Sequence, residues 1–212
     1  MLKLKKFGNI VVILITFLVL DLIYSSAEAK VNINDYLNEI TSLQASFEQR
    51  IFSPENDLID YSEGSFLLKK PGKIMWKFTA PSKNKIVVHD QKITTYDADL
   101  NQVLILPFSD RYQSSLANIL LKNDSLMSYY KIRSETQKDN LYSVVLDQKG
   151  SNNLFKKVKI TIVKMHLTKI KLWDANDQSI EISFDDIVLN VSLSDASFEF
   201  SIPKGADVFD QT

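Results

Sequence analysis

The chain of 212 residues has no cysteine, only five glycines and only two histidines. Without cysteine, disulfides and zinc–thiolate sites are excluded. The glycines are too few and too scattered to form a phosphate-binding loop or the G-x-S-x-G turn of many hydrolases. These absences remove three common classes of protein from consideration: thiolate metalloproteins, P-loop proteins and hydrolases with a nucleophile elbow.

The remaining candidates for chemistry are two histidines and two pairs of aspartates. His89 and His166 have no second histidine at a ligand spacing, so we predict neither a metal site nor a cofactor. Asp97–Asp99 falls in an expected turn, where aspartate usually accepts hydrogen bonds from its own backbone. No glycine-containing calcium loop follows it. Asp185–Asp186 is the other pair, and a hydrolase with carboxylates facing across a cleft stays open as an alternative.

The first 29 residues have the pattern of a cleavable secretory signal. Three lysines within the first six residues precede the apolar run Ile10–Leu20, and small residues follow at Ala27 and Ala29. Eleven apolar residues form a helix of about 16 Å, too short for a hydrocarbon core of ~30 Å, which disfavours an uncleaved anchor. We predict a signal peptide over 1–29 and one domain over 30–212, exported to the periplasm.

Positive and negative charges nearly balance, with 25 Lys and Arg against 26 Asp and Glu. Such a balance provides no positive field for nucleic acid or anionic lipid, so neither is predicted as a partner. No linker rich in proline, glycine or serine divides the chain behind the signal segment. The length and this uniformity favour a single domain with a sizeable core.

Most of the chain alternates apolar and polar residues with the period of a β-strand. Helical patterns are limited to a short N-terminal segment that Asn32 or Asn34 can cap, and to the segments 114–121 and 124–130. This pattern predicts a single, strongly curved antiparallel sheet with helices over one opening. The eleven expected strands cover about 43–51, 66–70, 74–79, 85–89, 92–96, 102–106, 131–134, 141–147, 158–164, 167–173 and 179–191, with a further short one at 198–202.

Large apolar side chains share one parity on the first three strands, and these should face inward. The simpler interpretation is a packed core, as in any small barrel. The alternative is that a curved sheet half covered by helices leaves a cavity for an apolar ligand. The residues concerned are Phe47, Phe66, Leu68, Ile74, Trp76 and Phe78.

Four motifs in order carry a resemblance to a known family. The segment 43–49 reads LQASFEQ, with A-x-F-x-Q at its end, and 64–76 places a glycine, a lysine–proline pair and a tryptophan at set distances. Pro81 closes that strand, 96–103 reads YDADLNQV, and 200–208 reads FSIPKGADV. Together they resemble the LolA family of periplasmic outer-membrane lipoprotein carriers, over nearly all of the chain behind the signal segment.

The resemblance implies a mainly β fold, an incomplete antiparallel β-barrel with a helical lid over an apolar cavity that holds the acyl chains of a lipoprotein. It implies a monomeric carrier or chaperone, not an enzyme. Its expected partners are acylated lipoproteins and an ATP-driven lipoprotein-releasing transporter of the inner membrane. Delivery would be to an outer-membrane lipoprotein receptor or to the outer membrane itself.

The resemblance also suggests roles for particular residues. Lys70 stands where the family often has an arginine that holds the lid closed; lysine cannot fork to several carbonyls, so we expect a looser latch. The cavity walls are expected to be Phe47, Phe66, Leu68, Trp76 and Phe78. The underside of the lid is expected to comprise Ile119, Leu120, Leu126 and Met127.

Alternatives of the same fold stay open. A lipid-anchored receptor would need a cysteine to carry its lipid, and this chain has none. A lipoprotein-sensing protein of the envelope would usually carry a second domain, for which we expect no room. A different lipid-binding protein of the envelope would show the same apolar cavity.

Overall fold

The computed structural model describes residues 30–108, 120–121, 126–150 and 154–212. The chain divides into two units, Met1–Lys30 and Val31–Thr212, and the fold is that of the second. The expected signal segment 1–29 and nearly all of the expected helix at 114–121 lie outside the described residues. None of the described helices is long and apolar enough to cross a bilayer.

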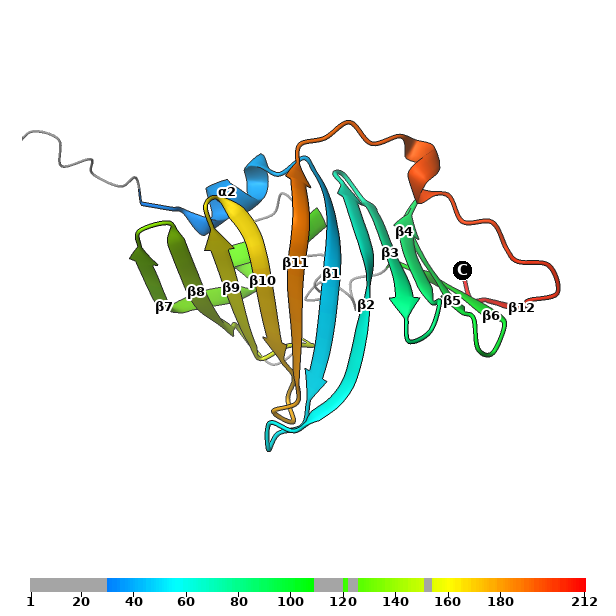
Figure 1. Ribbon diagram of the computed structural model, residues 1–212, viewed down its shortest axis with the longest axis horizontal. Coiled ribbons are helices and arrows are strands. Elements are labelled where there is room, and N and C mark those ends of the chain that lie inside the picture. Colours follow the sequence, from blue (N-terminus) through cyan, green and yellow to red (C-terminus); the bar gives the residue numbers. More distant parts are fainter. Residues whose placement is uncertain (1–29, 109–119, 122–125, 151–153) are drawn as a thin grey trace, which may run out of the picture. The chain divides into compact units, whose positions relative to one another are not determined.

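Twelve strands form one open sheet in the order β12-β6-β5-β4-β3-β2-β1-β11-β10-β9-β8-β7 (Figure 1). All neighbours are antiparallel except β12, which runs parallel to β6. The prediction of a mainly β, strongly curved antiparallel sheet is confirmed. The strands are β1 (Ser42–Phe52), β2 (Leu58–Lys69), β3 (Lys73–Ala80), β4 (Lys85–His89), β5 (Lys92–Asp97), β6 (Gln102–Pro107), β7 (Tyr130–Lys138), β8 (Leu141–Gln148), β9 (Lys157–Val163), β10 (His166–Trp173), β11 (Ser179–Leu189) and β12 (Asp207–Asp210).

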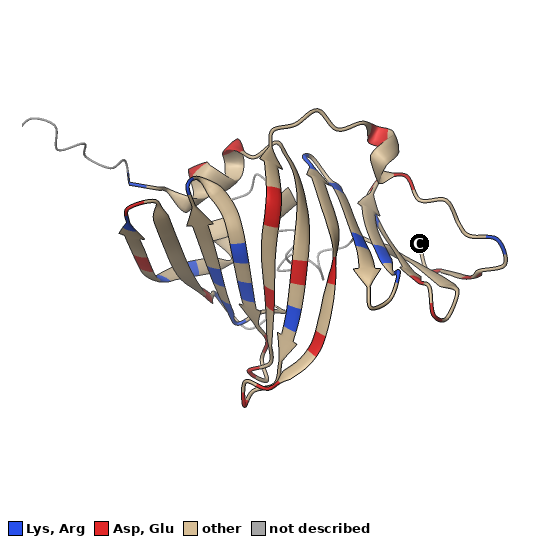
Figure 2. Cartoon of the chain, viewed as in Figure 1, with Lys and Arg blue, Asp and Glu red and all other residues tan. Residues whose placement is uncertain are grey.

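The sheet has an apolar inner face, defined by the side chains that share a cluster with Phe47. Strand alternation produces it: in β1, Leu43, Ala45 and Phe47 are buried whereas Gln44 is exposed. The outer face of the same strands carries charge, and Figure 2 shows basic residues on β10 beside acidic ones on β11 and β1. Lys169 and Glu181 form one such pair at 2.8 Å. The alternation of side chains along each strand therefore places apolar residues on the inner face and charged residues on the outer face.

The N-terminal helix α2 (Ile33–Glu39) packs on the inner face through Ile33, Tyr36 and Leu37. Of the two candidate caps, Asn32 is the one used: its Oδ1 accepts from the backbone N–H of Asn34 at 3.0 Å and more weakly from that of Asp35. An asparagine at this position satisfies amides that have no partner within the helix. Asn32 thus determines where the helix begins, and the spacing of the apolar residues determines which side of it is buried.

The expected helix over 124–130 is wrong in its described part. Residues Leu126–Ser128 form a single 3-10 turn, η2, and Tyr130 already begins strand β7. Tyr130 is fully buried and pairs with Gln148 of β8, while Lys149 donates its backbone N–H to the Tyr129 carbonyl. These sheet hydrogen bonds come from a distant segment and override the local helical preference.

The expected strand over 198–202 is also wrong. Ser194 caps a 3-10 turn, η3 (Asp195–Phe198), and Phe198 is buried against Met75 and Val87 on the outer face of β3 and β4. The last strand is instead β12, which adds to the edge of the sheet beside β6. The aromatic residues near 198 alternate as in a strand, but they cover a face of the sheet and do not extend it.

Candidate functional site

The centre of the inner face is a group of aromatic rings from four neighbouring strands. Phe47 meets Trp76 and Phe78 edge-on, at ring-centroid distances of 5.5 Å and 5.3 Å. Phe66 meets Trp76 at 4.7 Å and Phe184 at 5.5 Å. Such edge-on contacts favour aromatic pairs beyond their simple burial. We call Phe47, Phe66, Trp76, Phe78 and Phe184 the aromatic group.

Gly64 explains how two of these rings meet. In the sheet register Gly64 of β2 lies directly between Phe47 of β1 and Phe78 of β3. Because glycine has no side chain, the two phenylalanines close over its backbone. A Cβ there would lie 1.9 Å from the backbone oxygen of Lys77. The glycine of the G-x…K-P…W motif is therefore a requirement of strand packing.

All five residues expected in the cavity wall lie together on this face. Phe47, Phe66 and Leu68 are buried, Trp76 is 9% exposed, and Phe78 is half-buried and packs against the same cluster. Phe184 belongs to the group but was not expected. The sequence alternation places Phe184 on the same face as Ile182 of β11. Only the pairing of β11 with β1 shows that Phe184 lies opposite Phe47.

The indole of Trp76 carries the one polar atom within the aromatic group. Its Nε1 is buried and has no hydrogen-bond partner among the described residues. A buried donor without a partner costs free energy, and such groups are rare in folded proteins.

Polar bonds of Lys70 and Tyr36 help to hold α2 over the inner face, one toward each half of the sheet. Lys70, at the turn between β2 and β3, donates from Nζ to the carbonyl of Leu37 at 2.7 Å. The hydroxyl of Tyr36 donates to the carbonyl of Met165, in the turn between β9 and β10, at 3.2 Å. Burial lowers the pKa of Lys70 and raises that of Tyr36 to about 12. The helix thus bridges two separate parts of the sheet.

The expected lid residues are only partly within the described chain. Leu120 and Leu126 are buried in the inner-face cluster, and Met127 packs against it half-buried; Ile119 lies outside the described residues. Leu121 is also buried in this cluster, although it was not expected. These side chains cover the apolar face from segments that do not belong to the sheet.

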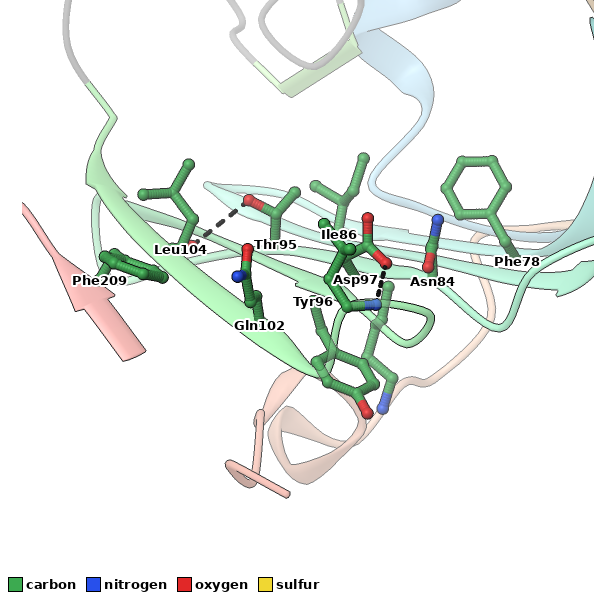
Figure 3. Close-up of a pocket in the computed structure, with 11 residues that line it drawn as sticks. Phe78, Asn84, Ile86, Thr95, Tyr96, Asp97, Gln102, Leu104 and Phe209 are labelled. Carbon is green, nitrogen blue, oxygen red and sulfur yellow. Dashed lines mark hydrogen bonds between the residues drawn. The ribbon is translucent and has the colours of Figure 1, made fainter. Parts of the chain in front are cut away.

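A pocket of about 460 Å³ opens on the same side of the sheet, at the ends of β3 to β6 (Figure 3). Its apolar wall includes Phe78, Ile86, Leu104 and Phe209. Its polar rim includes Asn84, Asp97 and Gln102. The expectation for Asp97 holds, because its Oδ1 accepts from the backbone N–H groups of Asp99 and Leu100.

The residues described provide no group of three side chains able to hold a metal ion. His89 lies 3.4 Å from the carboxylate of Asp90, and His166 is exposed. The described part of the site is mainly apolar surface, with a few polar groups at its edge.

Comparison with known proteins gives a family match over most of the chain. The model of the family "Outer membrane lipoprotein carrier protein LolA" matches residues 38–201. The outer-membrane lipoprotein carrier protein of Chromohalobacter salexigens is 32% identical over 81% of this chain and 82% of its own. That of Legionella pneumophila is 30% identical over 89% of this chain and 93% of its own.

Among solved structures, an uncharacterized conserved protein of Thermus thermophilus matches with a TM-score of 0.55 at 16% identity. It covers 84% of this chain and 97% of that one, and this likeness concerns the fold alone. The family model spans the strands that carry the aromatic group and the lysine–proline turn. The chain belongs to the LolA family of outer-membrane lipoprotein carrier proteins.

Proposed function

We propose that this protein is a periplasmic carrier that holds the acyl chains of a lipoprotein on its inner face. The observation that carries the proposal is an apolar face built by the sheet but covered by other segments. Those segments include α2, Leu120 and Leu126. Because α2 forms no strand pairing and Lys70 and Tyr36 tie it through side-chain bonds to backbone carbonyls, it can separate from the sheet while the strands stay paired.

The physical chemistry of the cargo calls for such a protein. Each methylene of an acyl chain costs about 0.8 kcal/mol to expose to water, so an anchor of several chains does not cross an aqueous space unaided. The carrier must shield the chains and later release them. A covered apolar face that opens and closes serves both steps, whereas a rigid pocket would serve only the first.

Residue roles follow from this arrangement as part of the proposal. Phe47, Phe66, Leu68, Trp76 and Phe78 form the wall that the chains contact. Leu120, Leu126 and Met127 lie on the underside of the cover, where a flexible methionine suits ligands of different shape. Lys70 is the latch between the sheet and α2.

The proposed route begins at an ATP-driven lipoprotein-releasing transporter of the inner membrane. It ends at a lipoprotein receptor of the outer membrane or at that membrane itself. The protein is not expected to catalyse a reaction, since transfer requires only that the chains move from one apolar environment to another. A signal peptide over 1–29 would place the chain in the periplasm.

The test adds the purified chain, without its first 29 residues, to spheroplasts that display lipoproteins on the inner membrane. We expect a soluble one-to-one complex in the supernatant, and Phe47→Glu should reduce its yield about tenfold or more, since a carboxylate in the wall opposes burial of acyl chains. Phe52→Glu is the matched control, because Phe52 lies on the outer face beside Lys171. If a known carrier releases lipoproteins in parallel and this protein does not, the carrier function is wrong and sensing or binding of another lipid replaces it.

A further inference from the structure

The pocket beside β3 to β6 is continuous with the aromatic group. One row of cross-strand neighbours runs from Phe66 through Trp76, Ile86, Thr95 and Leu104 to Phe209. Residues directly opposite one another on paired strands point to the same side of the sheet. The row therefore leads along the inner face from the aromatic wall into the pocket, without crossing an edge.

The next row toward the strand ends includes two carboxylates and two carboxamides. Gln102 of β6 lies opposite Asp97 of β5 and opposite Asp207 of β12. The Asn84 Oδ1 accepts from the backbone N–H of Ala98 at 3.0 Å. Within the described part of the chain, the Asn84 amide nitrogen and the whole Gln102 carboxamide have no hydrogen-bond partner. Figure 3 shows both carboxamides at the rim, with Asp97 between them. The pocket thus combines an apolar wall with spare neutral hydrogen-bonding groups.

The charges around the pocket indicate what it does not bind. Asp97 stands at the rim, and its carboxylate opposes an anionic ligand. Lys85 also lines the pocket, but its ammonium lies 5.7 Å from the centre of the Phe200 ring, and Phe200 packs on the outer-face cluster. A phosphate or a free carboxylate is therefore disfavoured here. A neutral carbonyl group, which accepts from a carboxamide N–H, fits the same donors.

We propose that this pocket binds the ester or amide carbonyls at the head of an acylated ligand. The acyl chains then follow the row of Leu104, Ile86 and Trp76 into the aromatic group. Gln102 and Asn84 are the residues that recognise the head. This inference rests on the proposed carrier function and adds to it a polar subsite that sets the direction in which the anchor enters.

The test compares three probes that share a hexadecyl or palmitoyl chain. A synthetic S-diacylglyceryl-cysteine lipopeptide has ester and amide carbonyls, dipalmitoylglycerol has esters only, and 1-hexadecanol has no carbonyl. Gln102→Met removes the carboxamide at nearly constant volume, and Asn84→Asp keeps the oxygen that Ala98 needs while replacing the amide donor. Gln44→Met, on an exposed position of β1, is the control.

We expect Gln102→Met to weaken binding of the lipopeptide about threefold to tenfold, as for the loss of one hydrogen bond. Binding of 1-hexadecanol should stay within about twofold, which also shows that the variant is folded. A loss with dipalmitoylglycerol as well assigns the contact to the ester carbonyls, and a loss with the lipopeptide alone assigns it to the peptide. Asn84→Asp should show the same selectivity with a larger effect, since it adds a negative charge.

Two results would overturn the subsite. One is equal weakening for all three probes, which would make the pocket a merely apolar extension. The other is wild-type affinity of both variants for the lipopeptide. In either case the carrier function stands as long as the wild-type protein binds the lipopeptide. If the wild type itself binds none of the probes, both proposals fail together.

Discussion

Gly64 lies in β2 between Phe47 and Phe78, and its missing side chain lets those rings meet at 5.3 Å. A residue of this kind contributes to the site without touching a ligand. Its importance comes from the distance between backbones, because a methyl group would lie 1.9 Å from the Lys77 carbonyl oxygen. The neighbour is backbone in a paired strand, so it cannot turn aside as a side chain could.

Gly64→Ala should therefore lower the free energy of unfolding by about 3 kcal/mol, the cost of severe overpacking between strands. Gly72→Ala is the informative comparison. Gly72 has φ of +78° and open space around it, so only backbone strain of about 1 kcal/mol is expected. Urea unfolding of both variants measures the difference. Equal losses in the two variants would show that the close approach at Gly64 relaxes freely.

At the scale of the element, the segment after β11 shows how charge fixes a piece of chain that has little strand pairing of its own. Asp195 accepts from Lys69 at 2.7 Å and lies 2.8 Å from Lys73, while Lys69 also donates to the carbonyl of Leu193. Phe198 is then buried on the outer face of β3 and β4. The two lysines hold the pKa of Asp195 at about 2.

This pairing makes the docking of η3 dependent on pH. Because the pKa of Asp195 in the folded chain lies below its ordinary value of 3.8, the stabilisation is complete above about pH 4 and is lost as the pH falls through about 2. We expect the NMR signals of the Phe198 ring to shift with that midpoint. In Asp195→Asn the shift should be absent and Phe198 should be looser at pH 7. If the Phe198 signals respond neither to protonation of Asp195 nor to its substitution, the ion pairs of Asp195 do not control the docking of η3.

For the whole molecule, α2 matters because it joins the two halves of an open sheet. Lys70 connects its end to the turn between β2 and β3, and Tyr36 connects it to the turn between β9 and β10. Strands β7 and β12 end the sheet on opposite sides and do not pair with each other. In the proposed carrier, a helix that bridges such an open sheet would control access to its inner face.

Removing either hydrogen bond should make the helix separate from the sheet more often. We expect amide hydrogen exchange in Ile33–Glu39 to accelerate about fivefold in Lys70→Met and in Tyr36→Phe, as for a bond of about 1 kcal/mol. The double variant should show roughly the product, about twenty-five-fold, because release of the helix breaks both bonds. Lys77→Met, exposed on β3, is the control. Unchanged exchange in the double variant would mean that apolar packing alone holds α2.

The hydrogen bond from the Tyr36 hydroxyl should also persist at alkaline pH. Burial raises the pKa of Tyr36 from 10.0 to about 12, so its contribution is complete below about pH 10 and disappears as the pH rises through about 12. The protection of the helix amides, measured relative to the intrinsic exchange rate at each pH, should therefore change little up to pH 10. The phenol thus holds α2 as a neutral donor throughout the physiological range.

Much of this protein followed from the sequence alone, and the reason is that strand alternation, caps and turns are local. The alternation of Leu43, Ala45 and Phe47 predicted which side of β1 is dry, Asn32 was one of two candidate caps, and Asp97 was expected to bond its own turn. The common face of Phe47, Phe66, Leu68, Trp76 and Phe78 was predicted in the same way, since parity assigns a side chain to a face without knowledge of the partner strand.

Only the tertiary structure decided which distant segments meet. Phe184 joins the aromatic group because β11 pairs with β1, and Tyr130 starts a strand because β8 is there to receive it. The row from Trp76 to Phe209 and the docking of Phe198 depend on pairings between segments far apart in the chain. Such contacts are settled by competition among many possible partners over the whole molecule, and no local pattern records the outcome.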